Sequence, residues 1–469
     1  MATDTGLWKF DALEMTRQFE RKQLSPVEVI QSVFERVSAF DKSINAFAHY
    51  APDEALTAAK QSEERWSRGE PLGPVDGVPV AIKDLILTKG WPTLRGSLAI
   101  SPDQPWSEDS PATARLREGG AVLFGKTTTA EFGWKGLSDC PVHGATRNPW
   151  NTRHTAGGSS GGSSAGAAAG FGPLHVVTDG GGSGRMPASH TGVVGFKPTL
   201  GRVAVYPYSQ NGTLYNVTPM ARTVGDTAAL FEVIGRPDPR DFNSLPPMVT
   251  GWRKALTSSV KGLKIAFSPT LGYATVAPDV AELAKNAVSI FAELGALVEE
   301  QDPGIENPMS IFRTFWATGA ARLLNSLGPD KAARVELGLQ DIAAEGHLLD
   351  AVTFASAVEK REALGRHFLH FHQKWDLLVT PMVAQTASMI DDSCIGLGKH
   401  TPLPAFTYLS PFAYPFNLTH QPAITVPCGV TAAGLPVGLQ IVGAKYMDLR
   451  VLEAALAFEQ AKPFPTSFS

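Results

Sequence analysis

The stretch that most constrains this chain runs from residue 157 to residue 189 and holds two turns rich in glycine and serine. A small-residue segment and a short β-like run over 175–178 separate the turns. Because glycine lacks a Cβ atom, the backbone of such turns can adopt conformations closed to other residues, and its N–H groups can approach a ligand closely. A flexible Gly/Ser linker is the plainer interpretation. The apolar flanks, and the second turn directly after the first, favour a built site instead.

Composition places the chain among ordinary globular proteins. Its 469 residues are 43% hydrophobic and carry a formal net charge of −4, which argues against a general nucleic-acid or membrane-surface role. The three cysteines, Cys140, Cys394 and Cys428, form no CxxC pair, so we expect neither a disulfide framework nor a zinc site. The chain shows no signal-peptide pattern and no apolar run of about 18 residues. We therefore expect a cytoplasmic protein.

Signals for helices and strands alternate along the first half of the chain, without a break that would mark a linker. Ser25, Pro26 and Glu28 predict a helix start with an N-cap, a first-turn proline and a capping box. The other elements expected here are helices over 53–66 and from 110, strands over 78–82, 121–124 and 176–178, a helical turn over 165–170, and loops over 192–203.

The alternation is clearer from residue 260 onward, where Asp279 is expected to cap a helix over 280–294 that ends at Gly295. Aromatic residues at helical spacing in the next stretch are more typical of a core than of a ligand pocket. They are Phe312, Phe315 and Trp316. The other elements expected here are strands over 263–267, 296–298, 377–380, 423–426 and 437–442, helical structure over 307–370, a polar loop over 386–404, and a closing helix over 449–458. We interpret the whole as one α/β domain.

Lys83 stands directly after the expected strand over 78–82. A surface lysine at the end of a strand is the commoner case. Apolar residues on both sides argue for partial burial, and burial disfavours the ammonium form and lowers the pKa of a lysine. A lysine with a lowered pKa can act as a base.

Two familiar chemistries do not match the glycine-rich turns. A phosphate-binding loop needs a lysine after its glycines, and residues 161–164 are followed by none. A Ser-His-Asp hydrolase needs a usable histidine, but no G-x-S-x-G elbow is present and the nearby histidines form no pattern. Those histidines are His143, His154, His175 and His190. The two turns offer another route, in which one serine attacks, a second relays its proton, and a neutral lysine accepts it.

The chain resembles the amidase signature family over the stretch from about Leu13 to Gln460. The matching pieces, in the same order and spacing, are GVPVAIKD around Lys83, AGGSSGGSSAG at 156–166, TDGGGSGRMPAS at 178–189, GVVGFKPTLGRV at 192–203, and FNLTHQPAITVPCG with GLPVGLQIVG near the end. The resemblance implies a single large α/β domain, 1–469, with a central mixed β-sheet covered by helices on both faces. Its expected parts are an N-terminal helical segment (about 10–70), a catalytic core (about 71–235), variable pocket segments (about 303–410) and closing strands and helix (about 411–462).

Residue by residue, the resemblance implies Ser183 as nucleophile, Ser159 as bridging serine and Lys83 as base. It also implies a cis peptide bond between Gly158 and Ser159. The oxyanion hole is expected to consist of the backbone N–H groups of Gly180, Gly181, Gly182 and Ser183. Such donors must lie about 3 Å from the developing oxyanion, which explains the glycines. Asp179 and Arg185 are expected to support the turn, and Cys140 and Cys428 to be ordinary buried residues.

The activity implied is hydrolysis of small or aryl amides through an acyl-enzyme, with carbamates (urethanes) and some esters within the same chemistry. The resemblance implies no metal and no organic cofactor, a small-molecule substrate, no nucleic-acid or membrane partner, and a monomer or homodimer. The alternative is the A subunit of a tRNA-dependent amidotransferase, a glutaminase with a partner subunit. That subunit typically has Arg-Gln-Pro after the nucleophile, where this chain has Arg185-Met186-Pro187. A non-catalytic scaffold is disfavoured because Lys83, Ser159 and Ser183 are intact.

Three residues depart from the family pattern, namely Gly184, Met186 and His190. The family often has a larger aliphatic residue at the position of Gly184. We expect these departures to loosen or enlarge the pocket beside the nucleophile and thus to bear on substrate choice, with Gly184 the first position to consider. Part of the pocket is expected to come from segments 307–350 and 384–410.

Overall fold

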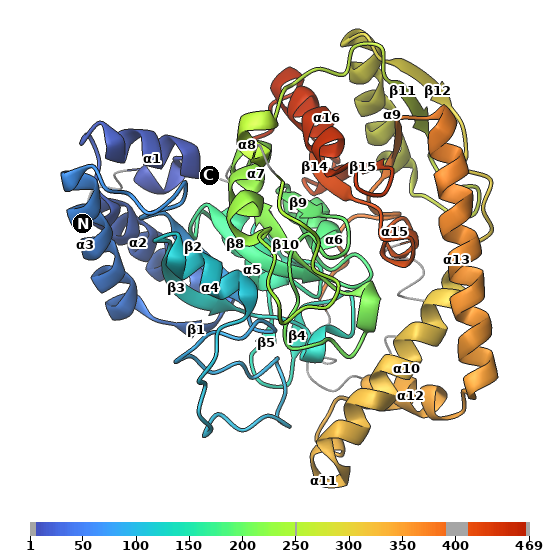
Figure 1. Ribbon diagram of the computed structural model, residues 1–469, viewed down its shortest axis with the longest axis horizontal. Coiled ribbons are helices and arrows are strands. Elements are labelled where there is room, and N and C mark those ends of the chain that lie inside the picture. Colours follow the sequence, from blue (N-terminus) through green and yellow to red (C-terminus); the bar gives the residue numbers. More distant parts are fainter. Residues whose placement is uncertain (1–5, 249–250, 391–410, 466–469) are drawn as a thin grey trace.

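The computed structural model describes residues 6–248, 251–390 and 411–465, and in them one large sheet crosses the molecule (Figure 1). The sheet has 11 strands in the order β1-β3-β2-β8-β10-β9-β14-β15-β13-β11-β12. It is mixed, because β2 runs parallel to β3 and β8 whereas β10, β9, β14 and β15 pair antiparallel. The strands are β1 Phe47–Tyr50, β2 Pro79–Lys83, β3 Val122–Thr127, β8 Leu174–Asp179, β9 Val194–Lys197, β10 Asn216–Ala221, β11 Lys264–Phe267, β12 Leu297–Glu300, β13 Leu377–Pro381, β14 Ala423–Val430 and β15 Pro436–Gly443.

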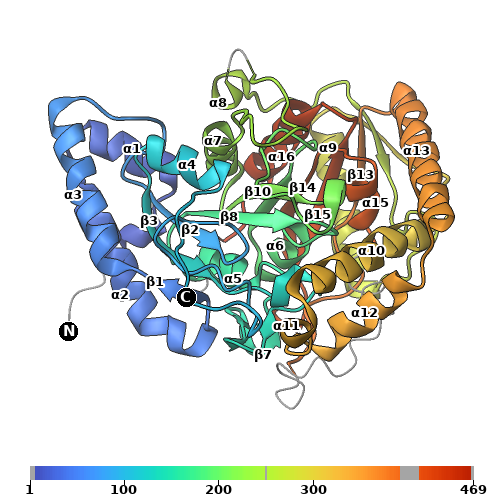
Figure 2. The same ribbon diagram turned by 60° about the horizontal axis from the view of Figure 1, so that its bottom comes forward.

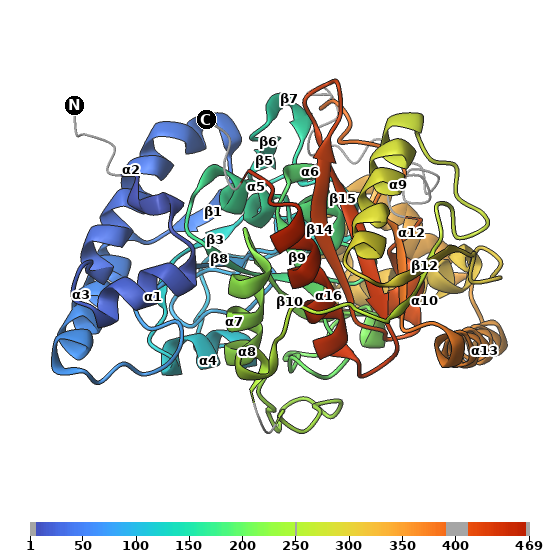
Figure 3. The same ribbon diagram turned by 90° about the horizontal axis from the view of Figure 1, so that it is seen from above.

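Helices cover both faces of this sheet, as the resemblance implies. Helices α1–α3 lie at the β1 end, and α10–α13 gather at the opposite end of the molecule (Figure 2). Helices α7 and α16 lie side by side on one face (Figure 3). The helices are α1 Ala12–Glu20, α2 Pro26–Ile44, α3 Pro52–Arg68, α4 Pro111–Glu118, α5 Gly161–Ala169, α6 Arg185–Thr191, α7 Val224–Ile234, α8 Trp252–Ala255, α9 Pro278–Glu293, α10 Met309–Leu327, α11 Pro329–Ala332, α12 Leu337–His347, α13 Ala351–Lys374, α15 Tyr414–Leu418 and α16 Asp448–Ala461. Short pieces complete the fold: two hairpins, β4 Asp139–Cys140 with β5 Gly144–Ala145 and β6 Arg147–Asn148 with β7 Asn151–Thr155, and 3-10 turns at Leu7–Lys9, Glu131–Gly133 and Gly212–Leu214.

The alternation of side chains along the strands assigns each face its own core. Val80 and Ile82 of β2 point into the core formed with α4, α7, α9 and α16. Ala81 points to the other face, where α2 and α5 pack. Because side chains alternate along a strand, Lys83 shares the face of Ala81, on the side of α5.

Most of the expected elements are confirmed, and the capping box at Ser25 and Glu28 is formed in full. Asp279 is a correction, because α9 begins at Pro278, two residues earlier than expected, and Ala277 is its N-cap. The first glycine-rich turn is shorter than expected, since Gly161 already opens α5.

The loops expected over 192–203 are wrong in part, because β9 occupies Val194–Lys197. Helices α6 and α7 and strand β10 were also missed. Every residue of α5 and α6 is buried, so neither helix has the polar face that a 3.6-residue pattern requires. Proline at position 187 further obscures α6.

The expectations about the cysteines, the polar loop and membrane-spanning helices can be compared with the described residues. Cys140 and Cys428 are buried and free, as expected, whereas Cys394 and most of the expected loop over 386–404 lie outside the described residues. No helix in the described residues is long and apolar enough to cross a membrane.

Candidate active site

The parallel pairing of β2 with β8 brings the two halves of the site together. Ile82 of β2 is the register partner of Val176 of β8, so the strands end at the same edge of the sheet with Lys83 and Asp179 as their last residues. Helix α5 packs across both strands. The serine turn before α5 therefore meets Lys83, and so does Thr178 of β8, which stands just before the glycine turn.

Lys83 is fully buried, deeper than the partial burial expected from its flanks. Its side-chain nitrogen is within hydrogen-bond distance of Ser159 Oγ (2.7 Å), Ser160 Oγ (2.8 Å) and Thr178 Oγ1 (2.9 Å). Burial holds the pKa of Lys83 well below its ordinary value, and the negative charge of Asp179 only partly opposes this. Hydroxyl groups, rather than a carboxylate, therefore surround this lysine.

The first turn is held tightly around Ser159. The peptide bond between Gly158 and Ser159 is cis, as the resemblance implies. Ser138 Oγ donates to the Ser159 carbonyl at 3.1 Å and accepts from Gly161 N–H at 2.7 Å. A Cβ atom on Gly158 would lie 2.5 Å from the backbone of Leu137. Glycine is required here because two stretches of backbone nearly touch.

The second turn is organised by the carboxylate of Asp179. It accepts hydrogen bonds from the N–H groups of Gly182, Gly184 and Arg185, at 2.8, 3.2 and 3.3 Å. The Arg185 guanidinium binds both carboxylate oxygens, at 2.9 and 3.0 Å. Burial alone would raise the pKa of Asp179, but the charge and hydrogen bonds of Arg185 outweigh it and hold that pKa well below the usual range. The turn is thus wrapped around a buried ion pair.

Two residues from the C-terminal part of the chain lock this ion pair in place. Asn417 of α15 accepts from Arg185 at 2.7 Å and donates to the Asp179 carboxylate at 3.0 Å. Gln440 of β15 accepts from Arg185 at 2.7 Å. Since α15 and β15 come from the far end of the sequence, the closing segments of the chain hold the nucleophile's turn.

The N–H groups of the second turn differ in what they bind. That of Gly182 donates to Asp179, whereas those of Gly180, Gly181 and Ser183 donate to no other group in the described residues. Ser183 is 8% exposed, and its hydroxyl makes no hydrogen bond with any residue that the structure describes. Three N–H groups and one hydroxyl are therefore open to a ligand.

The aromatic cluster of α10 lies against these glycines. A Cβ atom on Gly181 would lie 2.7 Å from the Phe312 ring, and one on Gly180 would lie 3.4 Å from Trp316. The two rings stack on each other with centroids 5.2 Å apart. Both side chains are buried, as expected of a core. They nevertheless also form a wall beside the glycine turn, which the sequence pattern did not indicate.

The three residues that depart from the family pattern are all buried. A Cβ atom on Gly184 would lie 2.9 Å from Thr218 Oγ1 and 3.4 Å from Asp179 Oδ2, so the expectation that it enlarges the pocket is wrong. Thr218 and Asp179 occupy that space. Met186 packs with Met382, Val383 and Ala413. Burial lowers the pKa of His190 to about 4, so this imidazole is neutral at neutral pH.

Four residues of this site were not singled out from the sequence, although each stands within or next to a quoted motif. Ser160 and Thr178 flank the two turns, and Asn417 and Gln440 belong to the two C-terminal motifs. Only the fold shows what each one contacts. No cluster of three or more possible metal ligands occurs among the described residues.

Comparisons with known proteins agree on one family. The sequence profile of the Amidase family matches residues 28–452. An acylamidase from Rhodococcus erythropolis is 36% identical over 468 residues, covering 98% of this chain and 97% of the relative. The A subunit of the glutamyl-tRNA(Gln) amidotransferase from Geobacter metallireducens is 33% identical and covers 97% of both chains.

Solved structures of the same family have the same fold. A bacterial aryl acylamidase of the amidase signature family superposes with a TM-score of 0.89 at 30% identity, covering 97% of this chain and 96% of that one. A 6-aminohexanoate cyclic dimer hydrolase superposes with a TM-score of 0.88 at 28% identity, covering 98% of both. The chain therefore belongs to the amidase signature family and is a hydrolase that acts on carbon–nitrogen bonds of non-peptide amides.

Proposed function

We propose that this protein hydrolyses small or aryl amides through an acyl-enzyme formed on Ser183, with Ser159 as proton relay and Lys83 as base. The observation that carries the proposal is the buried lysine, which is surrounded by hydroxyl groups and hydrogen-bonded to Ser159 at 2.7 Å. Burial lowers the pKa of Lys83 well below its ordinary value, and we propose that its side chain is neutral at working pH and can accept a proton. Within the same chemistry fall carbamates and some esters, whose carbonyl groups offer the same point of attack.

In the acylation step, the oxygen of Ser183 attacks the substrate carbonyl carbon and forms the new C–O bond. Its proton passes to Ser159, whose own proton passes to the nitrogen of Lys83. The negative charge on the carbonyl oxygen is stabilised by the N–H groups of Gly180, Gly181 and Ser183. Gly182 is left out of this set, because its N–H binds Asp179.

The tetrahedral intermediate then collapses with cleavage of the C–N bond. Lys83 returns its proton through Ser159 to the leaving amine, which departs neutral. Water attacks the acyl-enzyme along the same path in reverse and releases the acid and free Ser183. Each proton that Lys83 takes up is given back, so the cycle needs no other reactant.

The substrate class is supported by the wall and by the relatives. Phe312 and Trp316 lie directly against the turn that carries Ser183, where flat apolar rings suit an aryl or alkyl group. The relatives include an acylamidase and an aryl acylamidase. We propose a small organic amide as substrate, bound by a monomer or homodimer.

Glutaminase activity as an amidotransferase A subunit is the second candidate, favoured by the 33% identity to such subunits. Against it stands Met186, which is 2% exposed and lies among Met382, Val383 and Ala413. The glutamine typical of that subunit would bury its amide among apolar side chains here, at a cost of roughly 1–3 kcal/mol if unpaired. The immediate surroundings of the nucleophile thus suit a free-standing amidase better.

The test replaces Ser183 by alanine and measures hydrolysis of a chromogenic anilide. We expect a loss of at least about 10⁴-fold in kcat with an unchanged thermal midpoint, whereas Ser310→Ala, at an exposed position of α10, keeps full activity. Turnover retained in Ser183→Ala would refute the nucleophile. A parallel panel of an aliphatic amide, a carbamate and glutamine ranks the substrates, and glutamine as the best of them would favour the second candidate.

A further inference from the structure

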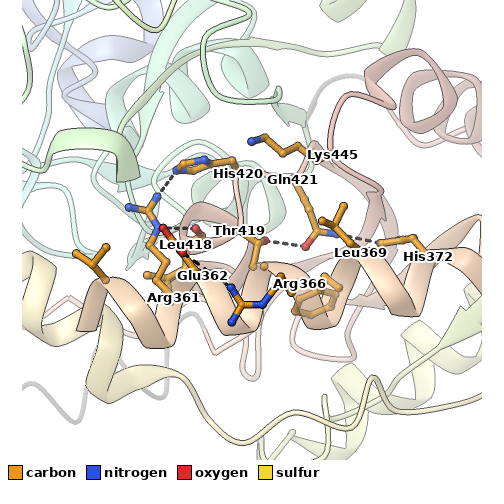
Figure 4. Close-up of a pocket in the computed structure, with 13 residues that line it drawn as sticks. Arg361, Glu362, Arg366, Leu369, His372, Leu418, Thr419, His420, Gln421 and Lys445 are labelled. Atoms are coloured by element: carbon orange, nitrogen blue, oxygen red, sulfur yellow. Dashed lines mark hydrogen bonds and ion pairs between the residues drawn. The ribbon is translucent and has the colours of Figure 1, made fainter. Parts of the chain in front are cut away.

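A cavity of about 410 Å³ lies between α13 and the turn that leads from α15 into β14 (Figure 4). Its lining includes Arg361 and Arg366 of α13, residues 418–421 opposite, and Lys445 after β15. Lys83, Ser159 and Ser183 are not among its lining residues. The volume is within the range of small-molecule sites, roughly 300–1,000 Å³. This cavity is therefore separate from the site of the proposed chemistry.

The charges around the cavity are mostly positive. Arg361, Arg366 and Lys445 face a single carboxylate in the lining, that of Glu362. Arg366 and Glu362 are 3.9 Å apart and more than half exposed, and such a pair contributes little. Lys445 has no carboxylate within 4 Å in the described residues, and its nitrogen lies 4.9 Å from the Tyr446 ring. The lining thus carries an excess of positive charge.

Arg361 is held by neutral groups alone. It donates to the Leu418 carbonyl at 2.7 Å, to Thr213 Oγ1 at 2.7 Å and to the ring nitrogen Nε2 of His420. No carboxylate forms an ion pair with it in the described part of the chain. Burial lowers the pKa of Arg361 to about 10, and only Tyr208 partly opposes this fall. An anion in the cavity would supply further compensation for the buried charge.

The two histidines of the lining do not add charge at neutral pH. His420 accepts from Arg361, and burial lowers its pKa to about 2. Its backbone has a φ of 62°, an uncommon conformation for a residue other than glycine, and its ring lies toward Arg361 (Figure 4). His372 is bound by the Trp375 carbonyl and Gln421, and burial lowers its pKa to about 4. The polar walls are satisfied internally, so Arg361, Arg366 and Lys445 carry the charge.

The rest of the lining is apolar. Phe368 is fully buried, Leu369 is 56% exposed at the rim, and Val358 and Leu418 complete the apolar part. A bare inorganic anion would leave this part in contact with water, whereas a neutral apolar molecule would leave the cations unpaired. An aromatic or short aliphatic group that carries one carboxylate matches both.

We propose that this cavity is a second binding site, specific for a small organic carboxylate with an apolar body. The carboxylate binds Arg366 and Lys445 and offsets the charge of Arg361, while the apolar body packs against Phe368 and Leu369. The same chemical class includes the acid that amide hydrolysis releases, a point that rests on the proposed function. The site itself does not depend on that function.

The experiment is calorimetric titration of benzoate into enzyme whose Ser183 has first been sulfonylated with phenylmethanesulfonyl fluoride. This blocks the first site, and the mass increase verifies the reaction. We expect benzoate to bind, and the double variant Arg366→Gln/Lys445→Gln to bind at least about 10-fold more weakly, since both charged partners of the carboxylate are lost. Lys360→Gln removes one charge from the exposed side of the same helix and is expected to leave the Kd unchanged.

Two matched probes separate the contributions. Benzyl alcohol has the ring without the charge and inorganic phosphate has the charge without the ring, so both are expected to bind at least about 10-fold more weakly than benzoate. Absence of benzoate binding, an unchanged Kd in the double variant, or equal binding of either probe would overturn the proposal. Failure of the sulfonylation would count against Ser183 as nucleophile. The comparison between variants would still decide whether benzoate binds in the second site.

Discussion

Two lysines on neighbouring parallel strands show what distinguishes a candidate base from a structural cation. Lys83 ends β2, and Lys126 lies in β3 as the register partner of Ile82. Both are fully buried. Lys126 forms an ion pair with Asp84 at 3.0 Å, whereas Lys83 forms hydrogen bonds with three hydroxyl groups. The two lysines thus share burial and differ in whether a carboxylate is bound to them.

The alternation of side chains along β2 explains this difference. Ile82 and Asp84 point to the face of Lys126, and Lys83 points to the opposite face, toward α5. Burial lowers the pKa of Lys126 to about 8, with Asp84 opposing the fall. Burial lowers the pKa of Lys83 well below its ordinary value, opposed only by Asp179, which forms no ion pair with Lys83 among the described residues. Carboxylate placement, rather than depth, therefore decides which lysine is free to accept a proton.

Removal of each lysine is expected to have the largest and most contrasting effects. Lys83→Met should lower kcat/KM by at least about 10²–10⁴-fold, because the base is lost. Lys126→Met should keep kcat/KM within about tenfold but lower the free energy of unfolding by roughly 3–5 kcal/mol, because Asp84 is left buried and unpaired. Anilide kinetics and urea unfolding measure the two effects. A similar activity loss in both variants would abolish the distinction.

The two serines that bind Lys83 sharpen the comparison at an intermediate level. Ser159→Ala should lower kcat by about 10²–10⁴-fold, because the proton loses its relay. Ser160→Ala removes a hydrogen bond of nearly the same length and should cost only about tenfold. Single-turnover acylation measures both. Equal losses would mean that hydrogen bonding to Lys83, rather than proton relay, is what Ser159 provides.

The smallest expected effect is a shift in a pH profile. Thr178 Oγ1 accepts from the ammonium form of Lys83 and so stabilises it. Thr178→Val should lower the pKa of Lys83 further, and the acid limb of kcat/KM should move to lower pH with less than about tenfold loss of activity. Asp84→Asn is the control on the opposite face, and it should leave the limb in place. A shift in the control instead would assign the limb to Lys126.

Short contiguous motifs explain why the proposed catalytic side chains could be picked out from the sequence. Ser159 and Ser183 stand in runs of glycines and small residues whose composition has few structural explanations, whereas Lys83 ends an apolar strand within the motif GVPVAIKD. The residues that hold the glycine turn in place could not be predicted in this way. Asn417 and Gln440 reach Arg185 across more than 200 positions, and no local pattern encodes that contact.

Complete burial explains why one of the helices was missed. Helix α6 has no polar face, so periodicity could not reveal it. Gly184 was misjudged for a related reason, since only the fold shows that Thr218 and Asp179 fill the space beside it. Phe312 belongs to the core as expected, but its contact with Gly181 depends on how α10 returns to the sheet.

The central claim is that Lys83 is neutral at working pH, and nuclear magnetic resonance of ¹⁵N-lysine tests it most directly. Its side-chain nitrogen signal is identified by its absence in Lys83→Met and is followed as the pH is raised. We expect loss of the ammonium form well below the ordinary value of 10.5, at the same pH at which kcat/KM rises to its plateau. If the signal shows that Lys83 remains an ammonium ion while kcat/KM rises to its plateau, the account is contradicted.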